Sequence, residues 1–89
     1  YVSSNYPTPF NPTTRFYIDM PKAGNLSVTI YDVNGKLVKE LINTYVNKGR
    51  VQSLWSGKNE FGMMSPTGIY FLRVETSSNY HVQKLALVK

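Results

Sequence analysis

The sequence predicts an all-β fold, an immunoglobulin-like antiparallel β-sandwich of about seven strands, and three observations carry this prediction. Apolar and polar residues alternate over several short segments, which is the pattern of half-buried strands. Turn residues separate these segments roughly every 8–12 residues, as in immunoglobulin-like sandwiches. No long helical pattern and no internal repeat competes with this pattern, and the 89 residues suffice for one domain but not for a second core.

The first part of the chain predicts an edge segment followed by a strand. Residues 6–12 contain three prolines, which fix the backbone φ angle and remove hydrogen-bond donors. We therefore expect an extended segment at a sheet edge, not a helix or a central strand. Residues 15–20 then alternate, with Phe16, Ile18 and Met20 on one face, and predict a half-buried strand that ends at a Pro–Lys–Ala–Gly–Asn turn.

A hairpin is predicted next. Residues 26–31 alternate and are rich in β-branched side chains, so they form the clearest strand pattern of the chain. Asn34 and Gly35 follow, and Asn-Gly is the strongest short hairpin signal. Residues 36–42 are predicted as the return strand, because the turn precedes them and the run is short. Four apolar positions in this run would also suit a short amphipathic helix: Leu37, Val38, Leu41 and Ile42.

The second half of the chain predicts three more strands. Residues 50–55 form one, and we expect its tryptophan, Trp55, to pack between the sheets. A glycine-rich loop over residues 56–68 follows. Residues 69–75 are apolar on both faces, which is typical of a strand that lies centrally or is covered by a neighbouring segment. A polar turn leads into the final strand, residues 80–88.

The composition offers little for catalysis. The chain has no cysteine, which excludes thiol chemistry and cysteine zinc sites. His81 is the only histidine, and we expect an exposed or edge residue there and not a base or a metal ligand. Asn59 and Glu60 share a loop, but one acid and one amide are a poor calcium ligand set. The glycine spacing matches no phosphate-binding motif. We therefore expect no enzymatic activity, no cofactor and no metal.

The charge pattern argues against a nucleic-acid partner and leaves open a weak attraction to an anionic surface. Ten Lys and Arg against five Asp and Glu give a net charge of +5. These basic residues are spread along the chain, which favours a solvated surface over a nucleic-acid-binding tail. No apolar stretch approaches the roughly 20 residues that span a membrane. A carbohydrate platform would need exposed aromatic rings, and Tyr17, Tyr31 and Tyr45 are the best candidates for these.

Six segments, taken in order, carry a family resemblance. They are residues 5–12 (NYPTPFNP), 13–24, 28–38 (VTIYDVNGKLV), 55–59 (WSGKN), 66–71 (PTGIYF) and 83–89 (QKLALVK). Together they resemble the type A C-terminal sorting domains of the type IX (Por) secretion system of Gram-negative bacteria. No single motif is specific, but the ordered set covers nearly the whole chain. The sequence departs from the family pattern at Ser56, usually Asp, and at Ser53, where valine is common.

The resemblance implies a function. Members of that family lie at the C-terminus of secreted enzymes and adhesins, and the outer-membrane translocon recognises the folded domain. A surface sortase then removes the domain and attaches the cargo to lipopolysaccharide. We therefore expect residues 1–89 to be a single C-terminal sorting domain, excised from a larger secreted protein. It would be a non-catalytic signal that directs its cargo through the periplasm to the cell surface or the medium of a Gram-negative bacterium.

The resemblance also places recognition at the two ends of the chain. Twelve residues of the terminal strand and the opening motif are the candidates: Lys84, Leu85, Ala86, Leu87, Val88, Lys89, Asn5, Pro7, Pro9, Phe10, Asn11 and Pro12. A terminal strand with a free end can pair with the sheet edge of a partner. The lysines of such a strand would either contact that partner or keep the edge soluble.

Two other functions fit the sequence as well. One is an accessory immunoglobulin-like module of a secreted enzyme, which binds carbohydrate or acts as a spacer. The other is a structural module similar to the hook-capping immunoglobulin-like domain of flagellar assembly. Position within the parent protein separates the first of these from a sorting signal, which should be the last element.

Overall fold

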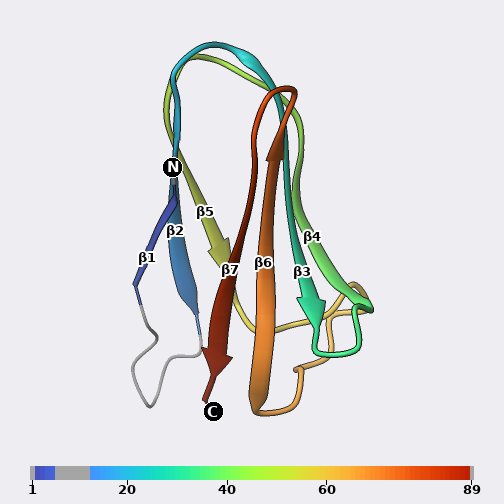
Figure 1. Ribbon diagram of the computed structural model, residues 1–89. Helices are drawn as coiled ribbons and strands as arrows, with labels where there is room; N and C mark the ends of the chain where they lie inside the picture. Colours follow the sequence, from blue (N-terminus) through green and yellow to red (C-terminus); the bar gives the residue numbers. More distant parts are fainter. Residues whose placement is uncertain (1, 6–12, 89) are drawn as a thin grey trace.

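The computed structural model describes residues 2–5 and 13–88 and confirms the predicted sandwich (Figure 1). Its seven strands are β1 (Val2–Asn5), β2 (Thr14–Met20), β3 (Gly24–Asp32), β4 (Leu37–Val46), β5 (Gly49–Trp55), β6 (Gly68–Thr76) and β7 (Tyr80–Leu87). One sheet has the order β1-β2-β5 and the other the order β4-β3-β6-β7, and all neighbours are antiparallel. None of the described residues forms a helix long and apolar enough to cross a bilayer.

Two short crossovers join the sheets at one end of the molecule. Residues 21–23 carry the chain from β2 to β3, and residues 47–48 carry it from β4 to β5 (Figure 1, top). The β3–β4 hairpin and the long β5–β6 loop lie at the opposite end. Since β4 and β5 contact each other along one side of the sandwich, β1 and β7 lie along the other.

The core lies between the sheets, on the faces that the alternation predicts. Its buried side chains are Phe16, Ile18, Met20, Leu26, Val28, Ile30, Trp55, Tyr70, Leu72, Val74, Leu85 and Leu87. Trp55 is 2% exposed and packs edge-on against Tyr70, with ring centroids 5.2 Å apart. Its indole Nε1 donates to the carbonyl oxygen of Lys58 at 3.0 Å, so the polar end of the buried ring is satisfied.

Strand β4 explains why residues 36–42 also suited a helix. The pairing with β3 shifts register twice, so that Thr29 faces Glu40 directly after Val28 faces Ile42, and Tyr31 faces Leu37 directly after Ile30 faces Lys39. A β-bulge adds an extra residue to one strand and interrupts strict alternation. Two bulges therefore allow Val38, Leu41 and Ile42 to pack against the core without a period of two.

The hairpin is confirmed at Asn34-Gly35, but its turn is not the two-residue type that this pair favours. That type needs a positive φ at both central residues, whereas only Gly35 has one, at 78°. The amide of Gly35 donates to the carbonyl of Asp32, and the Asp32 side chain accepts from the amides of Asn34 and Lys36. The aspartate carboxylate therefore organises a longer connection around these backbone donors.

The beginning of the chain differs from the expectation. The sequence pattern did not predict β1, which pairs with residues 15–18 of β2 as the edge of the three-stranded sheet. The predicted edge segment at residues 6–12 lies outside the described residues. A four-residue strand with a single apolar side chain gives no periodicity, and only its partner makes it a strand.

Burial of Tyr70 predicts that the free energy of unfolding of the sandwich falls at alkaline pH. It is 6% exposed, its hydroxyl donates to the carbonyl oxygen of Pro66 at 2.6 Å, and burial raises the pKa of this phenol above its usual value near 10. Stability is therefore fully present below pH 10 and falls as the pH rises toward the folded-state pKa. Tyr70→Phe should cost roughly 0.5–1.5 kcal/mol at pH 7 and remove part of this alkaline loss.

Urea denaturation of both proteins between pH 7 and pH 11, followed by circular dichroism, measures this effect. The difference in unfolding free energy between wild type and variant should shrink above pH 10. A difference in unfolding free energy that stays constant from pH 7 to pH 11 would contradict a raised pKa for Tyr70.

Candidate functional site

The described part of the predicted terminal site, Lys84 to Val88, lies on an edge strand and the residue after it. Strand β7 ends the four-stranded sheet and pairs with β6 alone in the strand order. The register runs without a shift from Gly68 opposite Leu87 to Glu75 opposite Tyr80. One side of β7 is thus fixed to its sheet, and the backbone of the other side is free of a sheet neighbour among the described residues.

Side chains of β7 divide cleanly between core and solvent. Leu85 and Leu87 are buried at 4% and 1% exposure and hold the strand against the core. Lys84, Ala86 and Val88 are exposed on the other face. The buried leucines therefore anchor the strand to its own sheet, while the side chains between them are exposed to solvent.

The second predicted element, the opening motif, is only partly described. Asn5 ends β1 and pairs with Arg15 of β2. Pro7, Pro9, Phe10, Asn11 and Pro12 lie outside the described residues, as does Lys89 of the terminal segment. Because β1 and β7 lie on the same side of the sandwich, the chain enters the motif on the side where β7 has its free edge (Figure 1).

An apolar outer surface borders β7, and the sequence analysis did not predict it. Val82 and Tyr80 of β7 and Ile69 of β6 are 45%, 60% and 37% exposed, and a shallow groove of about 400 Å³ lies nearby. Arg73 crosses this surface, with its guanidinium 4.9 Å from the Tyr80 ring and 3.5 Å from the Glu75 carboxylate. The signal for this surface was the two-sided apolar character of residues 69–75, which also fits their confirmed interior position between β3 and β7.

The β5–β6 loop makes hydrogen bonds both within itself and to strand β4. The Asn59 side chain accepts from the amides of Phe61 and Met63, and the Glu60 carboxylate accepts from the amide of Glu40. The candidate calcium oxygens of this loop are thus engaged with backbone donors. Among the described residues, no group of three or more His, Asp or Glu side chains is placed to hold a metal ion.

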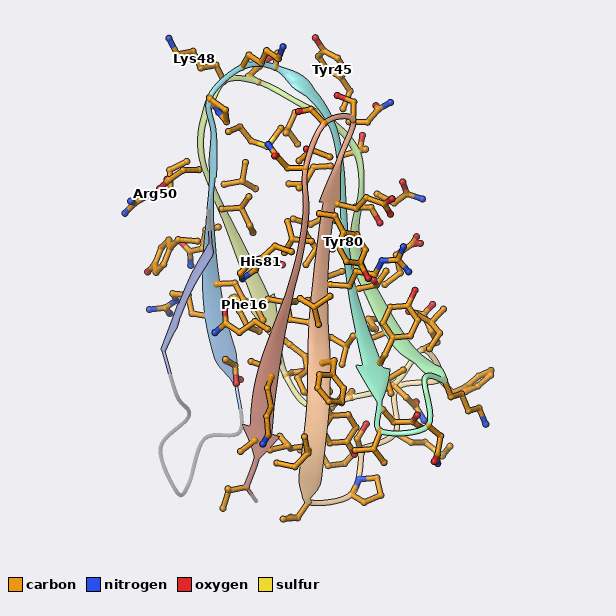
Figure 2. The ribbon with its side chains drawn as sticks, in the orientation of Figure 1. Phe16, Tyr45, Lys48, Arg50, Tyr80 and His81 are labelled. Atoms are coloured by element: carbon orange, nitrogen blue, oxygen red, sulfur yellow. The ribbon has the colours of Figure 1, made fainter. Side chains whose placement is uncertain are left out.

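The three candidate sugar-binding tyrosines lie apart. Tyr17 is on the outer face of the three-stranded sheet, with the Arg50 guanidinium 5.6 Å from its ring centre. Tyr31 is half-buried on the outer face of the other sheet, and Tyr45 is exposed near the crossovers (Figure 2). They do not form one platform. His81 is exposed on the edge strand, as predicted.

Comparisons with known proteins agree with this architecture. The model of the FlgD Ig-like domain family matches residues 5–79, so the match ends before β7. The crystal structure of FLGD from P. aeruginosa is similar with a TM-score of 0.67 and 24% identity, over 94% of this chain and 65% of that one. Dimeric latent PorU from Porphyromonas gingivalis is similar with a TM-score of 0.71 and 18% identity, over 99% of this chain and 10% of that one.

At these identities the two structures show a shared fold alone. The chain spans less than two thirds of the FLGD chain and a tenth of the PorU chain. No curated protein sequence matches the chain.

Proposed function

This chain belongs to the FlgD Ig-like domain family, and from that premise we propose that it acts as a C-terminal sorting domain of the type IX secretion system. It is a recognition module without a reaction of its own. The outer-membrane translocon binds the folded domain and passes the attached cargo from the periplasm to the cell surface or the medium. A surface sortase is a second partner, which separates the domain from its cargo.

The geometry of β7 is the observation that carries this proposal. The strand is anchored by Leu85 and Leu87, has a regular backbone edge, and exposes Lys84, Ala86 and Val88. An extended segment of a partner can add to such an edge, where backbone hydrogen bonds give affinity and alternate side chains give specificity. Because the strand is already ordered, the partner meets little conformational entropy cost on this side.

Family membership also fits a structural immunoglobulin-like module within a larger assembly. That second candidate rests on the match to the FlgD family, and it needs no free edge on β7. Substitutions on β7 therefore separate the two functions.

The proposal is tested by export of a reporter. Residues 1–89 are fused behind a periplasmic reporter in a host with a type IX system, and the reporter is measured in the medium and at the cell surface. The triple variant Lys84→Glu, Ala86→Asp, Val88→Asp changes only exposed positions, so its melting temperature should stay near that of wild type. Its export should fall roughly tenfold or more, the factor that corresponds to about 1.4 kcal/mol of lost binding free energy.

A matched triple variant at the opposite edge of the same sheet, on β4 and the residue just before it, serves as the control. Lys36→Glu, Asn43→Asp and Tyr45→Asp are exposed positions and change the net charge equally. This variant should export like wild type. Retention of the wild-type fusion in the periplasm, or equal export by both triple variants, would refute the sorting function.

A further inference from the structure

A cleft of about 470 Å³ opens between the two sheets near the crossovers. It lies between the end of β2 on one sheet and the beginning of β7 on the other, and the turn at residues 77–79 borders it. Figure 2 shows Tyr80 and His81 on opposite sides of β7, and His81 is the one directed toward the three-stranded sheet. The volume falls within the roughly 300–1,000 Å³ of small-ligand sites.

The cleft exists because the inner face of β7 changes character along its length. Leu85 and Leu87 fill the space between the sheets, but the next inward positions are half-buried Gln83 and exposed His81. His81 sits opposite Val74 in the register, so a polar residue takes the next inward position on this strand. In the described part of β1, the pairing with β2 reaches Ile18, which lines the cleft.

The floor of the cleft is apolar. Ile18, Met20 and Val74 line it and are only 2%, 6% and 5% exposed. An alkyl chain laid on them gains roughly 0.8 kcal/mol for each methylene removed from water.

The rim of the cleft is positively charged. Lys22 and Lys48 line it on the two crossovers, and neither has an ion pair among the described residues. Asp19 is the one acid among the described residues that line the cleft, and it is neutralised, since its Oδ1 accepts from Arg50 Nε at 2.9 Å. This hydrogen bond lowers the pKa of Asp19 and keeps it ionised and paired.

Hydroxyl groups complete the polar rim on the facing side. Ser77 and Ser78 are exposed in the β6–β7 turn, which is closed by a 2.8 Å hydrogen bond from the Thr76 amide to the Asn79 carbonyl. A Cβ atom added to Gly24 would lie 3.8 Å from Ser77 Oγ, so the β2–β3 crossover and this turn lie against each other. The serine hydroxyl groups at the opening of the cleft therefore belong to a turn whose backbone is fixed by a hydrogen bond.

We propose that this cleft binds a single-chain anionic amphiphile of the fatty-acid type. Its alkyl chain lies along Ile18, Met20 and Val74, and its anionic head meets Lys22 and Lys48. This ligand matches both halves of the site, an apolar floor and a rim on which the one acid among the described lining residues, Asp19, is already paired. The inference stands independently of the sorting function, because it concerns a different part of the molecule from the exposed positions Lys84, Ala86 and Val88.

Titration of the isotope-labelled chain with dodecanoate, followed by amide NMR shifts, tests the proposal. Saturable shifts should gather at residues 18–24, 48–50 and 74–81. Butyrate, which lacks the chain, should bind at least tenfold more weakly, and so should dodecyl maltoside, which lacks the charge. The double variant Lys22→Gln, Lys48→Gln alters only exposed side chains and should weaken dodecanoate binding by roughly tenfold.

Lys36→Gln, an exposed lysine at the far end of the molecule, is the matched control and should bind like wild type. Vesicles that contain an anionic phospholipid distinguish a membrane source of the ligand from a free one. Co-sedimentation that the double variant loses would assign the ligand to the membrane, and dodecanoate binding alone would assign it to a free amphiphile. Absence of saturable binding, shifts centred on Tyr31, Phe71 and Val82 or on Phe61, or an unaffected double variant would overturn the proposal.

Discussion

Replacing Trp55 with alanine is expected to lower the free energy of unfolding by about 3–5 kcal/mol. The ring is the largest fully buried side chain and packs edge-on against Tyr70 between the two sheets. Its loss leaves a cavity and also frees the Lys58 carbonyl, which accepts the indole hydrogen bond. Since small domains are stable by only about 5–15 kcal/mol, the variant should be substantially unfolded at elevated temperature.

Urea denaturation followed by far-ultraviolet circular dichroism measures this loss. Trp55→Phe keeps an aromatic ring and should cost less than alanine. Leu54→Ala is the matched control on the same strand, because Leu54 is 47% exposed, and should change stability by less than about 1 kcal/mol. An unchanged midpoint for Trp55→Ala would place the ring outside the core.

Gly57→Ala should destabilise the domain by about 2–4 kcal/mol, the second largest effect. Gly57 has a φ of 84°, which costs a residue with a Cβ roughly 1–2 kcal/mol. The new Cβ would also lie 3.0 Å from Met64 Sδ and 3.3 Å from Leu87 Cδ1. Met64 is partly exposed and can move, but Leu87 is buried, and overpacking of this kind costs about 1–3 kcal/mol.

Gly62→Ala separates strain from overpacking. Gly62 has nearly the same φ, 79°, but its added Cβ would meet nothing within 4 Å. This control should lose only the backbone contribution, about 1–2 kcal/mol. Hydrogen exchange should show reduced protection of β7 in Gly57→Ala and not in Gly62→Ala. Equal losses in both variants would show that Gly57 does not press on the terminal strand.

The local features of this fold could be predicted from the sequence. Strict alternation in residues 15–20 and 26–31 indicated both the strands and their buried faces, because the side-chain period of a strand is fixed by its backbone. The two-sided apolar run at residues 69–75 indicated an interior strand. The bulges of β4 could not be predicted, since its apolar spacing suits a bulged strand and a short helix equally well.

Non-local features escaped the sequence analysis. Strand β1 has one apolar residue, Val2, and depends on its pairing with β2. The edge position of β7 is set by the order in which the crossovers place the strands, and the resemblance alone pointed to its importance. Ile18 and His81 both line the cleft, from strands of different sheets that lie far apart in the chain. His81 was correctly expected to be exposed on an edge, but its place at the mouth of a cleft was not.

The two edges of the four-stranded sheet differ in a way that bears on self-association. Both bulges fall in the β3–β4 ladder, and bulged edges resist the pairing of another strand. The β6–β7 ladder has no such irregularity. Growth of a continuous sheet through many molecules requires each four-stranded sheet to pair with a neighbour at both of its edge strands. A sheet in which only one edge strand accepts a partner cannot be extended further. Pairing through β7 therefore joins this sheet to a single partner strand.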